Sequence, residues 1–102
     1  MPFDAEAPLH VTQRDILIRA REYISQGWCT LLRLDSQGNM CLRGAIAKAR
    51  GVHPEMTVLY DQNELTALLG FHNEADAMAW NDVQTSSAPV LARFDAAIEA
   101  LR

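Results

Sequence analysis

Several features that define other protein classes are missing from this 102-residue sequence. No apolar run approaches the roughly 20 residues that a membrane-spanning helix needs, so we expect no membrane association. Two cysteines are fewer than the four or more that a small secreted domain usually carries. Residues 1–10 lack the basic start and the apolar stretch of a secretory signal. These absences predict a cytoplasmic protein with free thiols, in which residues 1–11 are a flexible N-terminal lead-in.

Motifs that hold metals, phosphates or cofactors are also missing. The sequence has no Cys-x-x-Cys, His-x-x-x-His or His-Glu-x-x-His spacing and no glycine-rich phosphate loop. Acidic and amide residues alternate around Gly38 as in a calcium loop, but this glycine falls one position early. The twelfth residue of that loop would be Ile46 instead of the closing glutamate. We therefore predict no metal site and no cofactor.

The composition, with 49% hydrophobic and 22% charged residues, is typical of one globular domain. The net charge of −4 hides an asymmetry between the two halves of the chain. Residues 12–50 contain seven basic and three acidic residues, whereas residues 51–102 contain two basic and eight acidic ones. We expect the halves to pack together and neutralise each other. The alternative is that the basic half forms a binding face.

Helix signals recur throughout residues 12–102. Thr12 and Asp15 have the spacing of a capping box, and Gly27 is the expected end of the first helix. Asn39 is the expected cap of a second helix that Gly51 ends. Later helix starts are predicted at Asp61 with Glu64, at Asn73 with Asp76, and at Ser86 or Ser87 with Pro89 in the first turn.

The predicted fold is therefore mostly α, a compact single domain of four to five helices over residues 12–102. Residues 28–34 form a short apolar run before a turn-rich segment. This pattern is compatible with one short β-hairpin near residues 29–41 or with a helical turn.

Cys41 is the candidate catalytic nucleophile. In the first turn of a helix, the dipole and the free N–H groups favour a thiolate. A thiol-dependent enzyme would also need a base and an orienting group. The candidates are His53 and His72 as bases, and Asn81 and Asp82 as orienting groups. The alternative is that Cys41 is a small, buried apolar residue.

The Trp80-Asn81-Asp82 tripeptide is the candidate binding site for a partner, because tryptophan is enriched at binding hot spots. The structural alternative places Trp80 in the core, while Asn81 and Asp82 hold the loop that follows.

A helix-turn-helix element is the candidate for nucleic-acid binding. Gly51-Val52 and Pro54 suggest a tight turn between two helices. The stretch Val52–Leu65 has no lysine or arginine and several acidic residues, which would repel a phosphate backbone. We therefore do not expect nucleic acid as a partner, and the basic segment 14–50 is the remaining candidate for it.

Four motifs occur in order along the chain: Gly27-Trp28, Cys41-Leu42-Arg43-Gly44-Ala45, Trp80-Asn81-Asp82, and Val90-Leu91-x-x-Phe94-Asp95-x-Ala97-Ile98. Together, over residues 13–101, they resemble a family of small proteins of unknown function from actinobacteria and their phages. The chain departs from that pattern at Ala88 and Pro89, where the family has acidic residues. The resemblance implies a compact helical domain in a bacterial or phage setting, and it implies no mechanism.

Gly44 lies inside the second predicted helix, where glycine costs up to about 1 kcal/mol relative to alanine. We therefore predict the close approach of another helix, such as the one that carries Trp80. The leading hypothesis for the whole chain is a non-enzymatic accessory protein that binds another protein, with self-association left open. The alternatives are a thiol-dependent enzyme built on Cys41 and, third, a nucleic-acid binder.

Overall fold

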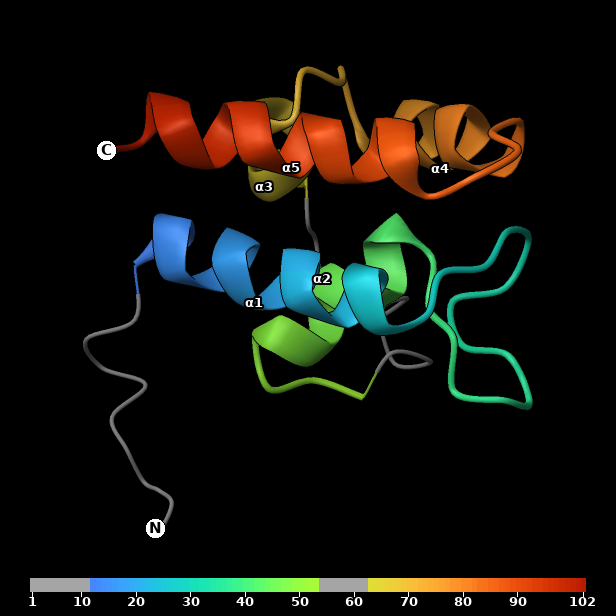
Figure 1. The fold of residues 1–102 in the computed structure, drawn as a ribbon. Helices are drawn as coiled ribbons and strands as arrows, with labels where there is room; N and C mark the ends of the chain where they lie inside the picture. The colour runs from blue at the N-terminus through green and yellow to red at the C-terminus, as the bar shows by residue number, and fades with distance from the viewer. Residues whose placement is uncertain (1–11, 54–62) are drawn as a thin grey trace, which may run out of the picture.

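The computed structural model (Figure 1) describes residues 12–53 and 63–102 and confirms the mostly α class. The helices are α1 (Gln13–Gln26), α2 (Leu42–Ala49), α3 (Asn63–Leu68), α4 (Glu74–Asp82) and α5 (Ala88–Ala100). In place of a hairpin, the described part of the 28–41 loop has two isolated β-bridges, Trp28 with Met40 and Leu34 with Met40. The chain between α1 and α2 is therefore a loop whose β-pairing is limited to single residues.

The start and the end of α1 lie where the sequence predicts them. The Thr12 hydroxyl accepts from the Asp15 N–H at 3.1 Å, and the Asp15 carboxylate accepts from the Thr12 N–H at 3.2 Å. Gly27 is the C-cap, with an extended backbone (φ 174°) in place of the left-handed conformation usual for a glycine cap. Here the glycine provides space, because a Cβ atom would lie 2.1 Å from Oδ1 of Asn39.

The predicted cap of α2 was wrong by two residues. Cys41 is the N-cap, and its sulfur accepts from the Gly44 N–H at 3.4 Å. Asn39 instead closes the turn before the helix: its N–H donates to Oδ1 of Asp35 at 2.8 Å and its amide to Oδ2 at 3.0 Å. The Asn39 side chain is therefore engaged by Asp35 and does not cap the helix. At the other end, Gly51 (φ +88°) follows the last turn as predicted.

The later helix starts are confirmed where the structure describes them. Oδ1 of Asn73 accepts from the Asp76 N–H at 2.8 Å at the start of α4. Ser87 is the N-cap of α5, with Pro89 in the first turn, although its hydroxyl makes no capping hydrogen bond. The predicted Asp61–Glu64 cap lies outside the described residues, because residues 54–62 are not among them.

The core lies where α1 packs against α2 and α5, and α4 contacts α2 and α3. Helices α1 and α5 lie side by side and run in opposite directions (Figure 1). Each helix contributes a row of apolar side chains, spaced three or four residues apart, to the same core. The largest apolar side chains with essentially no exposure are Leu17, Ile24, Leu42, Ile46, Val90 and Phe94.

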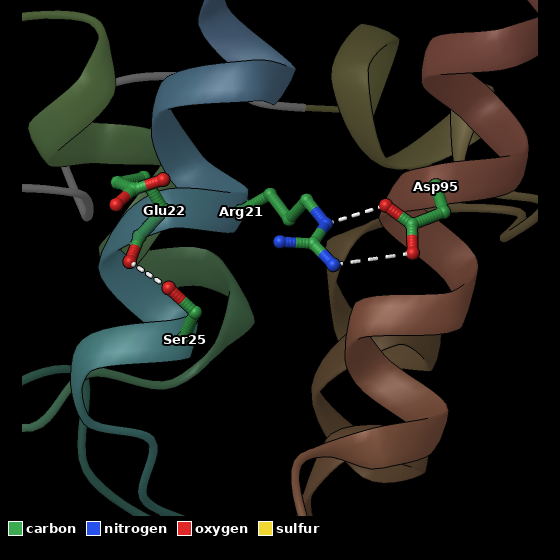
Figure 2. A network of polar contacts seen from close by, with 4 residues as sticks. All are labelled: Arg21, Glu22, Ser25 and Asp95. Carbon is green, nitrogen blue, oxygen red and sulfur yellow. Dashed lines mark hydrogen bonds and ion pairs between the residues drawn. The ribbon is translucent and has the colours of Figure 1, made fainter.

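Ion pairs join the basic first half of the chain to the acidic second half, as the charge distribution predicts. The Arg21 guanidinium of α1 donates to both carboxylate oxygens of Asp95 on α5 (Figure 2). Arg43 of α2 pairs with Glu74 of α4 at 2.7 Å, and both side chains are largely buried. Packing of the two halves therefore brings opposite charges together.

Gly44 does allow a close approach, but the predicted neighbour was wrong. A Cβ atom at this position would lie 2.1 Å from the carbonyl oxygen of Arg33 and 2.9 Å from its carbon. The backbone of the 28–41 loop, and not the helix that carries Trp80, thus lies against α2 here.

None of the helices within residues 12–53 and 63–102 is both long and apolar enough to cross a membrane.

Candidate functional site

Asn81 is the centre of a polar network that joins α4 to the 28–41 loop and to the start of α2. Its side chain is fully buried, and Oδ1 accepts from the Trp28 indole N–H at 2.9 Å and from the Leu42 N–H at 3.2 Å. Its amide nitrogen donates to the Cys29 carbonyl at 3.4 Å and to Oδ1 of Asp82 at 3.1 Å. One amide therefore fixes three segments that are far apart in sequence.

Asp82 extends this network to the tip of the loop. Its Oδ1 also accepts from the Leu31 N–H at 2.9 Å. Leu31 has φ +71° and is the only described non-glycine residue with a positive φ. For a leucine this left-handed conformation costs about 1–2 kcal/mol, and it persists only where the surroundings impose it.

The residue held in this strained conformation is also the most exposed large apolar side chain in the described ranges. Leu31 is 77% exposed, Leu32 is 56% exposed, and Val83 is 75% exposed. Because the Leu31 N–H donates to Asp82, which directly precedes Val83, the loop at Leu31 and Leu32 lies close to the end of α4. The loop between α1 and α2 passes that part of the fold in Figure 1. We call Leu31, Leu32 and Val83 the Leu31 patch.

The Trp80 ring packs within the fold. It lies 5.3 Å from the ring centre of Phe71, and the Arg93 guanidinium sits 4.9 Å from the Trp80 ring and 4.6 Å from the Phe71 ring. Arg93 also donates to the Leu69 carbonyl at 2.9 Å. These contacts favour a structural role for Trp80 over a role as an anchor for a partner.

The Cys41 thiol is fully buried, and burial raises its pKa, with the negative charge of Asp82 adding to the effect. Its sulfur accepts from the Gly44 N–H and lies 3.9 Å from the Met78 sulfur. Burial raises the pKa of Cys29 to about 11. Both cysteines are free, as predicted. The helix N-terminus therefore does not outweigh the cost of burying a thiolate at Cys41.

The candidate bases are His53, which follows α2, and His72, which precedes α4, and both are exposed. In the described part of the chain, the hydrogen-bond partners of the Cys41 sulfur are the backbone of Gly44 and Arg43 and the sulfur of Met78, and neither histidine is among them. Of the predicted catalytic set, the structure brings only Asp82 into electrostatic contact with Cys41. The described ranges also hold no group of three His, Cys, Asp or Glu residues suited to a metal ion.

The sequence prediction missed the Leu31 patch. Its leucines fall in the apolar run that was compatible with a strand, and an alternating strand would have buried one of them. Val83 falls in a polar loop after the helix. The available signal was the pair of adjacent leucines next to a turn, because consecutive residues of a short strand cannot both face the same core.

Residues 8–100 match the model of a family of unknown function (DUF6197). No curated protein and no solved structure gives a significant match to the chain.

Proposed function

We propose that this chain, which belongs to the family of unknown function DUF6197, is a non-enzymatic accessory protein that binds another protein through the Leu31 patch. The observation that carries the proposal is Leu31 itself, a leucine that is both 77% exposed and held at φ +71°. Glycine or asparagine would occupy this backbone position at lower cost. The leucine side chain therefore adds nothing to the core and costs backbone energy, which favours a role outside the fold.

The network beneath the patch supports the same proposal. A binding surface gains affinity when its residues are held in the bound conformation beforehand, because less entropy is lost on association. Asp82 fixes the Leu31 backbone, and the buried Asn81 fixes Asp82 and the start of the loop at Trp28. In this proposal the Asn81-Asp82 pair acts as the support of the site, and the leucines and Val83 make the contact.

The thiol-enzyme hypothesis has less support. A nucleophile must reach its substrate as a thiolate, whereas Cys41 has no exposed surface and its pKa is raised. No observation in the described residues favours this second function over protein binding.

The test is site-specific crosslinking from the patch. A photoreactive phenylalanine analogue is placed at Leu32 or Val83, and at Ala92 or Ala96 on exposed positions of α5 as matched controls. Crosslinking is performed in actinobacterial cells, the setting that the motif resemblance suggests. We expect one partner to be crosslinked from both patch positions and from neither control position.

Binding of the purified partner is then compared between the native chain and the Leu32→Ser and Val83→Ser variants. We expect each variant to bind at least about 10-fold more weakly while melting at the native temperature, since truncated hot-spot residues typically cost 1–2 kcal/mol or more. A crosslink to a second copy of the chain would identify the partner as itself. Adducts that form equally from α5, or binding that both variants retain, would overturn the proposal.

A further inference from the structure

A groove between α1 and the end of α2 is separate from the Leu31 patch. It consists of two adjoining cavities of about 300 Å³ and 480 Å³ that share Tyr23, Lys48 and Gly51. Cavities of this size hold small organic ligands. The first is also lined by Ile16, Arg19, Ala49 and Arg50, and the second by Leu34, Val52 and His53.

The first cavity is strongly basic. Arg19 comes from α1 and Lys48 and Arg50 come from the end of α2, so two elements bring three positive charges to one place. No aspartate or glutamate is among the described residues that line either cavity. This concentration of charge stands out in a chain whose net charge is −4.

Stabilisation of the α2 dipole explains only part of this charge. The C-terminus of a helix carries about half a negative charge, which a single lysine in the last turn more than offsets. Lys48 occupies that turn. Arg19 belongs to another helix and forms no ion pair with a carboxylate in the described part of the chain. The charge of Arg19 is therefore available to an anionic ligand.

Tyr23 positions the most central of these charges. The Lys48 ammonium lies 4.7 Å from the centre of the Tyr23 ring, a cation–π distance. A lysine held in this way loses less side-chain entropy when it binds an anion. Beyond Tyr23, the second cavity is lined by the apolar side chains of Leu34 and Val52.

We propose that this groove binds a small organic phosphate, with the phosphate between Arg19 and Lys48 and an apolar ring against Leu34 and Val52. A phosphate monoester carries −1.5 to −2 charges near pH 7, which suits a site of several cations. The ring accounts for the second, apolar cavity, which a free phosphate ion would leave empty. The site is distinct from the protein-binding patch and does not depend on it.

The test is titration of the isotope-labelled protein by NMR with adenosine monophosphate, adenosine and inorganic phosphate in parallel. We expect the monophosphate to shift signals of Tyr23, Lys48 and Val52 with a Kd below about 1 mM. Adenosine and inorganic phosphate should each bind at least about 10-fold more weakly. Raising the salt concentration from 0.05 to 0.5 M should weaken binding, since the contacts are exposed ion pairs.

Variants separate the site from general charge effects. Arg19→Gln and Lys48→Gln should each weaken binding at least about 5-fold, whereas Arg102→Gln, the matched loss of an exposed charge elsewhere, should leave it unchanged. Tyr23→Phe keeps the ring under Lys48 and should bind as the native chain does.

Equal weakening by all three charge variants would overturn the proposal. So would binding of inorganic phosphate alone, or binding of a single-stranded oligonucleotide with none of the mononucleotide.

Discussion

At the scale of single residues, Asn81 shows how a polar side chain in the core can organise a surface. Its oxygen accepts from the Trp28 indole and from the Leu42 N–H, which are 53 and 39 residues away in sequence. Removal of the amide would leave both donors without this partner, the Leu42 N–H in a buried place and the Trp28 indole in a partly buried one. A buried unpaired donor costs about 1–3 kcal/mol.

We therefore expect Asn81→Ala to lower the free energy of unfolding by about 3 kcal/mol or more in urea denaturation. The matched control is Asn73→Ala, which removes an exposed helix cap and should cost about 1 kcal/mol. An equal fall in the free energy of unfolding in the two variants would show that the buried Asn81 network stabilises the fold no more than one helix cap does.

For Leu31 we predict that a substitution does not lower the stability, in contrast to Asn81, because the Leu31 side chain is exposed and its backbone is strained. Leu31→Gly should release about 1–2 kcal/mol of strain and lose about 0.5–1 kcal/mol to the entropy of glycine. The variant should thus be as stable as the native chain or more so. Leu32→Gly, the neighbouring control without positive φ, should lose stability. If Leu31→Gly is the less stable of the two, its side chain serves the fold and not a partner.

The two thiols predict a dependence of stability on pH. The pKa of Cys41 is raised and that of Cys29 is about 11, so the folded state keeps protons that the unfolded chain releases near pH 8.5–9. The stability that they contribute is fully present below that pH and is lost as the pH rises toward 11. Urea denaturation from pH 7 to 11 should show this decline, and a Cys29→Ala/Cys41→Ala variant should show less of it.

Alkylation by iodoacetamide checks the same thiols directly. We expect Cys41 to stay unmodified in the folded protein at pH 6–8 and to react once urea unfolds it. Rapid modification of Cys41 at pH 6 would make the thiol-dependent enzyme, so far the alternative, the leading hypothesis.

At the scale of elements, Gly44 determines how closely the 28–41 loop lies against α2. Alanine is the better helix former by about 1 kcal/mol, but its Cβ would lie 2.1 Å from the Arg33 carbonyl oxygen. We expect Gly44→Ala to destabilise the protein by about 1–3 kcal/mol net, because the loop must move as a unit.

Gly38→Ala is the control for this substitution, since no atom lies within 4 Å of the added methyl group and only the φ of +86° is unfavourable. Its cost should stay near 1 kcal/mol. A Gly44→Ala variant that is more stable than the native chain would show that the 28–41 loop can move away from α2 at no cost in stability.

At the scale of the whole molecule, the exposed ion pair between the two halves contributes less to stability than the apolar core beneath it. The Arg21–Asp95 pair is exposed by 35% and 55%, and exposed pairs contribute about 0–1 kcal/mol each. The core beneath it includes Phe94, next to Asp95, and burial of a phenylalanine contributes about 1.5–3 kcal/mol.

We therefore expect the free energy of unfolding to change by less than about 1 kcal/mol between 0.05 and 1 M NaCl, measured by urea denaturation. The matched measurement is the titration of the basic groove, where a rise in salt from 0.05 to 0.5 M should already weaken binding. A fall in stability of several kcal/mol would mean that charge attraction holds the halves together.

The sequence by itself determined the helices and most of their ends. Thr12 with Asp15, and Asn73 with Asp76, cap their helices through contacts only three residues apart, so local sequence contains the whole interaction. The buried residues of α1 and α5, such as Leu17 and Ile24 or Val90 and Phe94, likewise recur at a spacing that places them on one face of a helix.

Only the tertiary structure decided what the residues between helices do. Asn39 binds Asp35 and does not cap α2, and the buried Cys41 caps that helix instead. Gly44 is required by the close approach of the Arg33 backbone. The exposed, strained Leu31 depends on Asp82, 51 residues away. The groove joins α1 to the end of α2, about 30 residues along the chain. Such contacts depend on where packing places distant segments, and the periodicity of a sequence does not encode that placement.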